Sequence, residues 1–486
     1  MTSNIHTTVE QWDLFELTME GPQEGNPFLD VTLEALFLSP SGTSFCVRGF
    51  YDGEGRYSVR FMPEETGEWS YRTDSSTAAL SGREGHFTCK PTTGNNHGPV
   101  RVRHQFHFGY ADGTPYLPMG TTCYAWTHQD EALQEETLVT LKNGPFNKMR
   151  MCVFPKSYQY NENEPPYHAF EGSQETGWDE RRFNPAFFRH LEQRIADLRD
   201  LGIEADLILF HPYDRWGYAK LSPETDDRYL RYITARLSAY RNVWWSLANE
   251  YDLMKSKTTE DWERFATIVT DHDPYSHLIS IHNCGPFYDY TRPWITHCSI
   301  QRVDVYRTAE NTNQWRQDWQ KPIVIDECAY EGNIDWGWGN ITGQEMVRRF
   351  WEGAVRGGYV GHGETYVHPE EILWWSKGGQ LHGSSPQRIG FLKQILEEGP
   401  EGRLDPLPSE WDVPRAGIAN HYYLYYFGFN QPSYRHFRMD PGTNYQVDVI
   451  DTWEMTVQTL EGIYEGAFRV DLPGKPYIAV RLRKAE

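Results

Sequence analysis

The sequence predicts a (β/α)8 barrel with a β-sandwich before it and a small β-domain after it. Three observations carry this prediction. Short apolar segments alternate with helical patterns between residues 115 and 361, both flanks show strand alternation, and 486 residues exceed the length of one ordinary domain. We therefore assign residues 1–95 to the sandwich, 96–400 to the barrel and 401–486 to the C-terminal β-domain.

The first region reads as short strands separated by turns. Polar and apolar residues alternate over 55–61, and 67–72 gives another strand; turn-forming residues gather at 39–42 and 51–55. Together these segments predict a small sandwich. The Gly- and Asn-containing stretch 93–99 is the expected linker to the barrel.

The barrel region alternates strands with helices. Strands are predicted at 115–122, 147–154, 203–210, 243–248, 278–282, 298–301, 322–326 and 358–361. Helices are predicted at 130–142, 184–201, 225–240, 258–270, 309–319 and 342–356, with the weakest helical signal between the fifth and sixth strands. Eight strands in this alternation favour a barrel over a doubly wound sheet.

The last region returns to strand alternation, as in 446–451 and 477–482. The Pro- and Glu-rich segment 399–415 is expected to be a linker or a covering loop.

Composition restricts the partners. The net charge of −22 argues against nucleic acid or an anionic membrane as a partner and fits a neutral substrate. No apolar run approaches about 18 residues, and the first residues lack the pattern of a signal peptide. The seven cysteines are scattered, without CxxC spacing, and are expected to be reduced thiols. We expect a cytoplasmic enzyme; the sequence leaves a homo-oligomer open.

Two glutamates end buried strands. Glu250 follows the apolar run 244–248 and Asn249, and Glu327 follows 323–325 and Asp326. Carboxylates at the C-terminal ends of parallel barrel strands lie where such barrels place their active sites. Two facing carboxylates can cleave a glycosidic bond. The alternatives are a carboxylate at a helix N-terminus for Glu250 and an ion-paired surface residue for Glu327.

These strand ends resemble the retaining glycoside hydrolases of clan A, a superfamily of (β/α)8 barrels, and the flanking sequence over 97–400 is most similar to its apiosidase-like branch. The resemblance implies that Glu250 is the acid/base and Glu327 the nucleophile. It also implies that Asn249 binds the sugar hydroxyl beside the anomeric carbon, and that the substrates are β-D-pyranosides or the equivalent α-L-furanosides.

Other residues at strand ends are candidates for substrate binding. Arg150 lies within an apolar strand and needs a partner, either Glu327, whose pKa it would lower, or another carboxylate. His211 and His282 end strands and bind sugar hydroxyls or serve the scaffold. The remaining candidates are Trp126, Gln301, Glu364 and Trp374, with Trp375 as the alternative to Trp374 for the floor of a sugar subsite.

We expect no metal and no other cofactor. His211, Asp214, His282 and His362 could gather at the barrel mouth, but the first strand lacks the His-x-His pair typical of metal-dependent barrel hydrolases.

The sequence therefore predicts a retaining glycoside hydrolase that acts on short oligosaccharides or glycosides. The insertion 156–182, rich in Tyr, Glu and Pro, is expected to close one end of the cleft and to enforce exo action. A transglycosylase would share every residue named above, and a non-catalytic carbohydrate-binding barrel is the other alternative.

Overall fold

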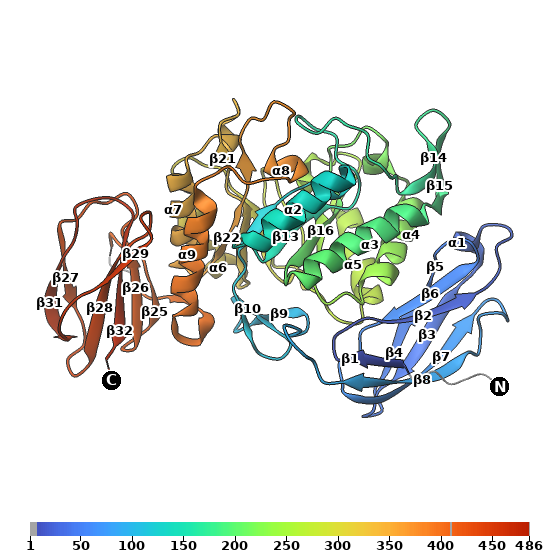
Figure 1. The fold of residues 1–486 in the computed structure, drawn as a ribbon, viewed down its shortest axis with the longest axis horizontal. Helices are drawn as coiled ribbons and strands as arrows, with labels where there is room; N and C mark the ends of the chain where they lie inside the picture. Colours follow the sequence, from blue (N-terminus) through green and yellow to red (C-terminus); the bar gives the residue numbers. More distant parts are fainter. Residues whose placement is uncertain (1–6, 409–410, 486) are drawn as a thin grey trace.

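The computed structural model describes residues 7–408 and 411–485. A (β/α)8 barrel occupies the centre, with sheets of the N-terminal region on one side and of the C-terminal region on the other (Figure 1). Residues 1–6, on which the signal-peptide prediction depends in part, and residues 409–410 of the predicted linker lie outside the described residues.

The N-terminal region contains two sheets that enclose an apolar core. One has the order β1-β8-β7-β3-β4 and the other β2-β6-β5. Their strands are β1 (Thr7–Glu10), β2 (Phe15–Glu20), β3 (Leu33–Leu38), β4 (Ser44–Arg48), β5 (Phe50–Tyr51), β6 (Arg56–Phe61), β7 (Gly67–Ser75) and β8 (Glu84–Lys90), with the short helix α1 (Pro27–Asp30). Phe15, Phe37 and Phe87 pack between the sheets, and Arg60 reaches across to Glu192 on the barrel.

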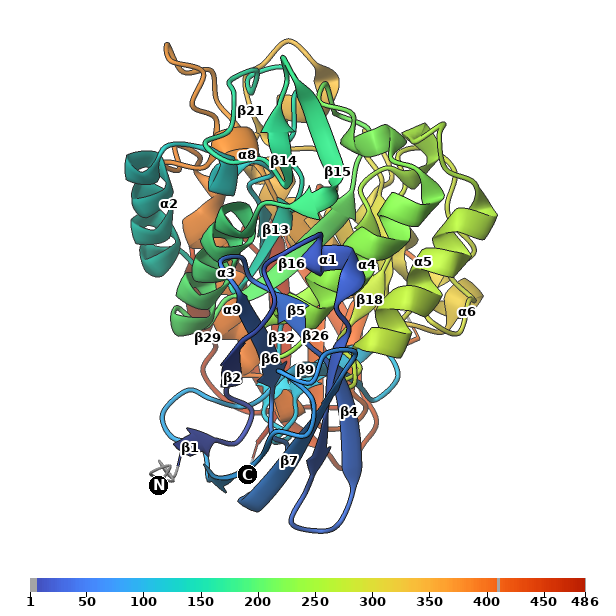
Figure 2. The same cartoon turned by 90° about the vertical axis from the view of Figure 1, so that its right-hand side faces the viewer.

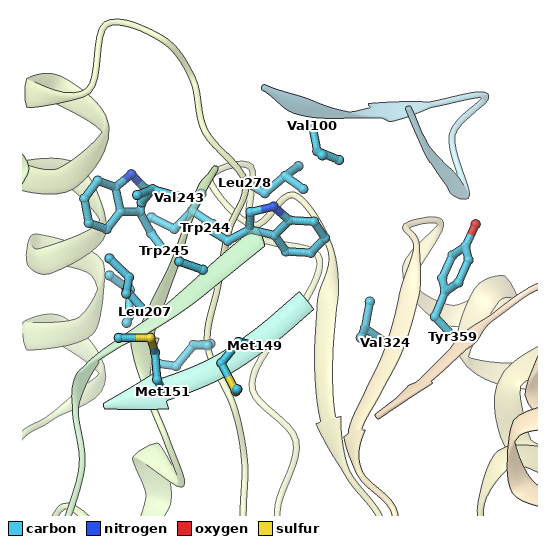
Figure 3. Close-up of a cluster of buried hydrophobic side chains, with 14 of the residues drawn as sticks. Val100, Met149, Met151, Leu207, Val243, Trp244, Trp245, Leu278, Val324 and Tyr359 are labelled. Carbon is cyan, nitrogen blue, oxygen red and sulfur yellow. The ribbon is translucent and has the colours of Figure 1, made fainter. Parts of the chain in front are cut away.

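A three-stranded antiparallel sheet lies against one end of the barrel. It consists of β9 (Val100–Arg103), β10 (His107–Tyr110) and β11 (Pro115–Tyr116). Phe108 of β10 packs on Trp244 and Tyr359, so this sheet covers the apolar base of the barrel. Figure 3 shows Val100 of this sheet above Trp244 and other buried side chains of the barrel.

Eight parallel strands form the barrel in the order β18-β17-β16-β13-β12-β22-β20-β19. A parallel bridge between His282 and Ser299 links the two outer strands and closes the circle. The strands are β12 (Gly120–Thr122), β13 (Lys148–Cys152), β16 (Glu204–Phe210), β17 (Val243–Ala248), β18 (Ile279–Ser280), β19 (Cys298–Gln301), β20 (Ile323–Glu327) and β22 (Tyr359–His362). The predicted fold class is confirmed.

Helices cover the outside of the barrel. They are α2 (Glu131–Asn143), α3 (Pro185–Asp200), α4 (Pro223–Leu237), α5 (Thr259–His272), α6 (Thr312–Trp319), α7 (Gly343–Ala354) and α9 (Ser385–Glu397). The residues just before α2, α3 and α4 follow the capping rules. The side chains of Asp130, Asn184 and Ser222 each accept a hydrogen bond from a backbone N–H of the first turn. None of the described helices is long and apolar enough to span a membrane.

The C-terminal region forms an antiparallel sheet, with strands of different lengths, beside α7 and α9 (Figure 1). Its strands are β24 (Asp405–Pro406), β25 (Arg415–Ile418), β26 (Tyr422–Tyr426), β28 (Asn444–Asp451), β29 (Thr456–Thr459), β30 (Tyr464–Glu465) and β32 (Ile478–Lys484), and β27 (Tyr434–Arg438) pairs with β31 (Ala467–Asp471). Trp351 of α7 stacks on Tyr426, so this sheet shares the core of the barrel.

Several predicted elements differ from the structure. The first predicted strand, 115–122, is divided between β11 and β12 because Pro118 has no N–H for a continuous ladder. Within the described residues, the segment between β18 and β19 holds no helix. Helix α9 and the hairpin β14 (Phe170–Ser173) and β15 (Gly177–Phe183) were not predicted, although Ile389, Leu392 and Leu396 of α9 have helical spacing.

The loops at the C-terminal ends of the strands gather at the end of the barrel opposite to β9 and β10. They carry β14, β15, β21 (Glu331–Gly332), β23 (Glu364–Thr365) and the short helix α8 (Trp374–Lys377) (Figures 1 and 2). All seven cysteines are free thiols.

Candidate active site

Glu250 and Glu327 line one cavity at the C-terminal mouth of the barrel. Its volume is about 200 Å³. Glu250 follows β17 and Glu327 is the last residue of β20, so both carboxylates come from the ends of barrel strands. The other residues that line it are Tyr124, Lys156, Tyr158, Tyr213, Asn249, Cys284, Gln301, Val303, Tyr330, Trp338 and Trp375.

The backbone of Glu250 is in the left-handed region, with φ 52° and ψ 55°. This conformation is uncommon for a residue with a Cβ and costs free energy that the surrounding structure must supply. It turns the chain sharply at the end of β17 into a 3-10 helix, Tyr251–Leu253. The turn leaves the Glu250 side chain in the cavity, and such local strain is frequent at functional sites.

Gln301 lies between the two carboxylates. A register shift in the pairing of β19 with β20 places Gln301 opposite Glu327. When the amide is oriented so that its NH₂ faces the acids, the nitrogen lies 3.2 Å from Oε2 of Glu327 and 3.0 Å from Oε1 of Glu250. The distance between Oε2 of Glu327 and Oε1 of Glu250 therefore cannot exceed the sum of these two distances.

Glu327 is surrounded by donors and positive charge. The hydroxyl of Tyr124 donates to Oε1 of Glu327, and Nε2 of His282 lies 3.3 Å from the same oxygen. Burial by itself raises the pKa of Glu327, but His282, Tyr124 and the charge of Arg150 lower it more. The net result is a pKa below the usual value, so Glu327 is ionised at neutral pH.

Glu250 has the opposite shift. Burial and the negative charge of Glu327 raise the pKa of Glu250, and the hydrogen bond from Tyr213 and the charge of Lys156 only partly oppose them. Of the two carboxyl groups, Glu250 therefore holds a proton more readily, and Glu327 is the one that ionises first. This is the division of roles that one acid and one nucleophile require.

Asn249 is held by Arg150. Its Oδ1 accepts from Nη2 of Arg150 at 2.9 Å and lies 3.2 Å from the hydroxyl of Tyr124, whose proton points to Glu327. Among the described residues its NH₂ has no acceptor, so it can donate to a sugar hydroxyl in the cavity. Arg150 also contacts Ser246 and lies 3.6 Å from Asp206. The sequence left open whether Arg150 pairs with Glu327 or with another carboxylate, and in the structure its ion-pair partner is Asp206. Arg150 acts on Glu327 only through its charge.

Of the residues predicted to bind substrate, Asn249 and Gln301 line this cavity, and six do not: Arg150, His211, His282, Trp126, Glu364 and Trp374. His211 contacts the carbonyl of Phe154 through Nε2 at 3.0 Å, and Trp126 directs its Nε1 at the sulfur of Met151 at 3.3 Å. Trp374 donates to Thr121 at 2.8 Å. The adjacent Trp375 faces the cavity, as does Tyr124 near Trp126. Trp374 and Trp375 are neighbours in the short helix α8, where successive side chains point in different directions.

Glu364 belongs to a second cluster of polar side chains behind the cavity. Ligand atoms of Glu331, His362 and Glu364 lie within 4.8 Å of one another, a spacing that could hold a metal ion. The carboxylates, however, accept the backbone N–H groups of residues 382–385 at the start of α9. Because a helix N-terminus favours anions, these N–H groups are sufficient partners for the carboxylates of Glu331 and Glu364.

The sequence did not single out most of the aromatic lining. Tyr158 and Trp338 lie in loops, Tyr213 lies two residues after His211, and Tyr330 lies three residues after Glu327. Lys156 begins the predicted insertion but was not assigned a role. The signal available was position alone, since each of these residues follows a barrel strand closely.

Comparison with protein families gives three matches along the chain. Residues 103–400 match the model described as "Apiosidase-like, catalytic domain". Residues 8–76 and 411–483 match two domains of unknown function, DUF5060 and DUF5605. Among curated protein sequences, none matches.

Two solved structures from Bacteroides vulgatus are similar. A candidate glycoside hydrolase shares 41% identity with a TM-score of 0.94, over 99% of this chain and 100% of that chain. A glycoside hydrolase of family 5 shares 14% identity with a TM-score of 0.63, over 80% of this chain and 93% of that chain. The second likeness concerns the fold alone.

Proposed function

This chain belongs to the apiosidase-like family and is a glycoside hydrolase with the clan A barrel; from that premise we propose that it hydrolyses short oligosaccharides or glycosides with retention of anomeric configuration, releasing single sugars from a chain end. In the first step Glu327 attacks the anomeric carbon and Glu250 gives its proton to the leaving oxygen. In the second step Glu250 takes a proton from water, whose oxygen displaces Glu327 from the same carbon.

The arrangement of the two carboxyl groups around Gln301 carries this proposal. Retaining enzymes keep the groups about 5–5.5 Å apart, and inverting enzymes about 6.5–9.5 Å apart. Oxygens that both lie within hydrogen-bond distance of one amide nitrogen, at 3.0 and 3.2 Å, fit the shorter class.

The opposite shifts in pKa support the same assignment. Glu327, with the lowered pKa, suits the nucleophile, and Glu250, with the raised pKa, suits the acid/base. Asn249 lines the same cavity, which supports its assignment to the hydroxyl next to the anomeric carbon.

The size of the cavity supports exo action. Its volume of about 200 Å³ is smaller than the roughly 300–1,000 Å³ of sites for drug-sized ligands. A volume of this size suits a single sugar ring, and the aromatic side chains of Tyr158, Trp338 and Trp375 border the cavity.

A panel of aryl glycosides that spans hexoses and pentoses in both anomeric forms tests the activity. Proton NMR of the first product then tests the mechanism: we expect the configuration of the substrate, and an inverted product would contradict retention. Oligosaccharides labelled at the reducing end test exo action, which predicts release of a monosaccharide and no internal cleavage.

A further inference from the structure

Lys156 lies in a cage of aromatic rings at the edge of the active-site cavity. Its Nζ is 3.6 Å from the ring centre of Tyr124, 4.5 Å from that of Tyr213, 4.9 Å from that of Trp375 and 5.6 Å from that of Tyr158. The residue is only 4% exposed. Aromatic faces attract a cation, but they replace only part of the hydration that an ammonium group loses on burial.

No carboxylate within the described residues forms an ion pair with Lys156. The other buried cations of the barrel have such partners: Lys148 lies 2.5 Å from Asp206 and 2.8 Å from Asp326, and Arg150 lies 3.6 Å from Asp206. Those two cations and two aspartates balance in charge. The remaining buried charges are those of Lys156 and of the pair Glu250 and Glu327. When Glu250 is protonated, the positive charge of Lys156 equals the single negative charge of Glu327.

The two tyrosines nearest to Lys156 connect it to the two catalytic acids. Tyr124 donates its hydroxyl to Glu327, and Tyr213 donates its hydroxyl to Glu250. A cation over a phenol ring withdraws electron density and makes the hydroxyl a stronger donor. One ammonium group thus stabilises negative charge on either acid.

We propose that Lys156 is a positioning residue that stabilises the single negative charge of the catalytic pair as this charge moves from Glu327 to Glu250 and back. The inference rests on the proposed retaining mechanism. Before the reaction the charge is on Glu327. When the Glu327–sugar bond forms and the glycosidic bond breaks, Glu250 gives up its proton and becomes the charged member.

The second step reverses this transfer. Water gives a proton to Glu250, its oxygen bonds to the anomeric carbon, and the bond from Glu327 to the sugar breaks with the electron pair returning to Glu327. The pair carries one negative charge throughout, so a fixed cation between Tyr124 and Tyr213 is matched to both stages. Arg150 cannot replace Lys156, because Asn249 and Asp206 already hold its guanidinium.

The effect on pH dependence must be separated from other groups around Lys156. Besides the two glutamates, the titratable and charged groups that act on Lys156 or surround it are Cys152, Arg150, His211, Tyr124, Tyr158 and Tyr213. Burial raises the pKa values of Cys152 and the three tyrosines, and it lowers those of His211, to about 4, and of Lys156 itself. Cys152, the tyrosines and His211 therefore keep their charge between pH 5 and 8, and the test below separates Lys156 from Glu250.

The test is Lys156→Met, which keeps a side chain of similar length without the charge. We expect both limbs of the pH profile of kcat/KM to move to higher pH by about one unit, because each acid loses a stabilising cation. With an activated aryl glycoside, whose first step needs little protonation, the acidic limb of kcat should rise similarly, since Glu250 then acts as base. Lys156→Arg should restore the limbs, and Lys142→Met on the surface of α2 should leave them in place.

Several outcomes would overturn the proposal. Loss of activity in Lys156→Met with unmoved limbs would mean that Lys156 only shapes the cavity. A basic limb that disappears in Lys156→Met but persists in Glu250→Gln would make Lys156 the titrating group. Lys156→Gln carries the same test if the Met variant does not fold.

A measurement without substrate keeps the inference separate from the proposed function. The ¹³C signal of the Glu250 carboxyl group, assigned by its loss in Glu250→Gln, reports the pKa directly. We expect it to rise by about one unit in Lys156→Met; no change would contradict the inference. If Glu250→Gln keeps the basic limb of activity, the assignment of Glu250 fails instead.

Discussion

Two pairs of buried glutamates lie at the C-terminal end of this barrel, and they differ in their access to the cavity. Glu250 and Glu327 border the cavity, whereas Glu331 and Glu364 lie behind it at 0% and 1% exposure. Both pairs have divided pKa values. Burial raises the pKa of Glu364 to about 7, and hydrogen bonds from Ser384 and Ser385 outweigh burial and lower that of Glu331.

The partners of the two pairs differ. Side chains from separate strands contact the catalytic pair, including Tyr124, His282 and Gln301, and one face of each carboxylate is left toward the cavity. Backbone N–H groups at the start of α9 saturate the other pair. A divided pair of carboxylates therefore does not identify an active site; access and adaptable side-chain partners do.

The largest expected effect is that of Glu327→Ala. Removal of the nucleophile should lower turnover by at least about 10,000-fold. Azide should restore part of it and give a glycosyl azide, because a small anion can occupy the space left by the carboxylate. Activity close to that of the wild type would show that Glu327 is not the nucleophile.

Glu250→Gln should have the next largest effect, and it should depend on the leaving group. Substrates with poor leaving groups should slow by about 100- to 10,000-fold, because they need the proton, while activated aryl glycosides keep their first step. The basic limb of the pH profile should disappear with the raised-pKa acid. Equal losses for good and poor leaving groups would show that Glu250 is not the acid.

Glu331→Ala probes the other pair and serves as the matched control for Glu327→Ala. It leaves the N–H groups of Ser384 and Ser385 without their acceptor, 2.7 and 3.0 Å away in the native protein. We expect the free energy of unfolding, measured with urea, to fall by about 2–4 kcal/mol. The pH limbs of the folded enzyme should not move, and a shift of either limb would place Glu331 in the catalytic machinery.

Two adjacent tryptophans sharpen the same distinction. Trp375 faces the cavity, and Trp374 donates to Thr121, which in turn contacts His362 of the second cluster. Trp375→Ala should raise KM roughly 10- to 100-fold through the loss of an aromatic sugar contact. Trp374→Phe should instead lower stability by about 1 kcal/mol with little effect on KM.

The last effect concerns the pH dependence of stability and Glu364. An acid whose pKa is higher in the folded state loses stabilisation as pH rises from its unfolded value, about 4.5, to its folded value, about 7. The stability of the wild type relative to Glu364→Gln should therefore decline between pH 5 and pH 7.5, by about 1–3 kcal/mol. Buried histidines act in the opposite direction but cancel in this difference. A constant difference would mean that Glu364 is ionised throughout.

Much of the fold was predictable because its signals are local. Apolar runs such as 244–248 and 323–325 mark buried parallel strands, and caps such as Asp130 mark helix starts. The prediction lacks helix α9, although its apolar residues have helical spacing. The strand predicted at 115–122 is too long, because Pro118 interrupts the ladder there.

The sequence alone determined the fold class, the family and the two glutamates, because an apolar strand that ends in a carboxylate is written in consecutive residues. Only the tertiary structure decided which neighbouring side chains line the cavity. The left-handed turn at Glu250, the register shift beside Gln301 and the tilt of the barrel strands fix these directions, and each depends on contacts between segments distant in the chain. For this reason the sequence left Trp374 and Trp375 as alternatives, and Lys156 became visible as part of the cavity only in three dimensions.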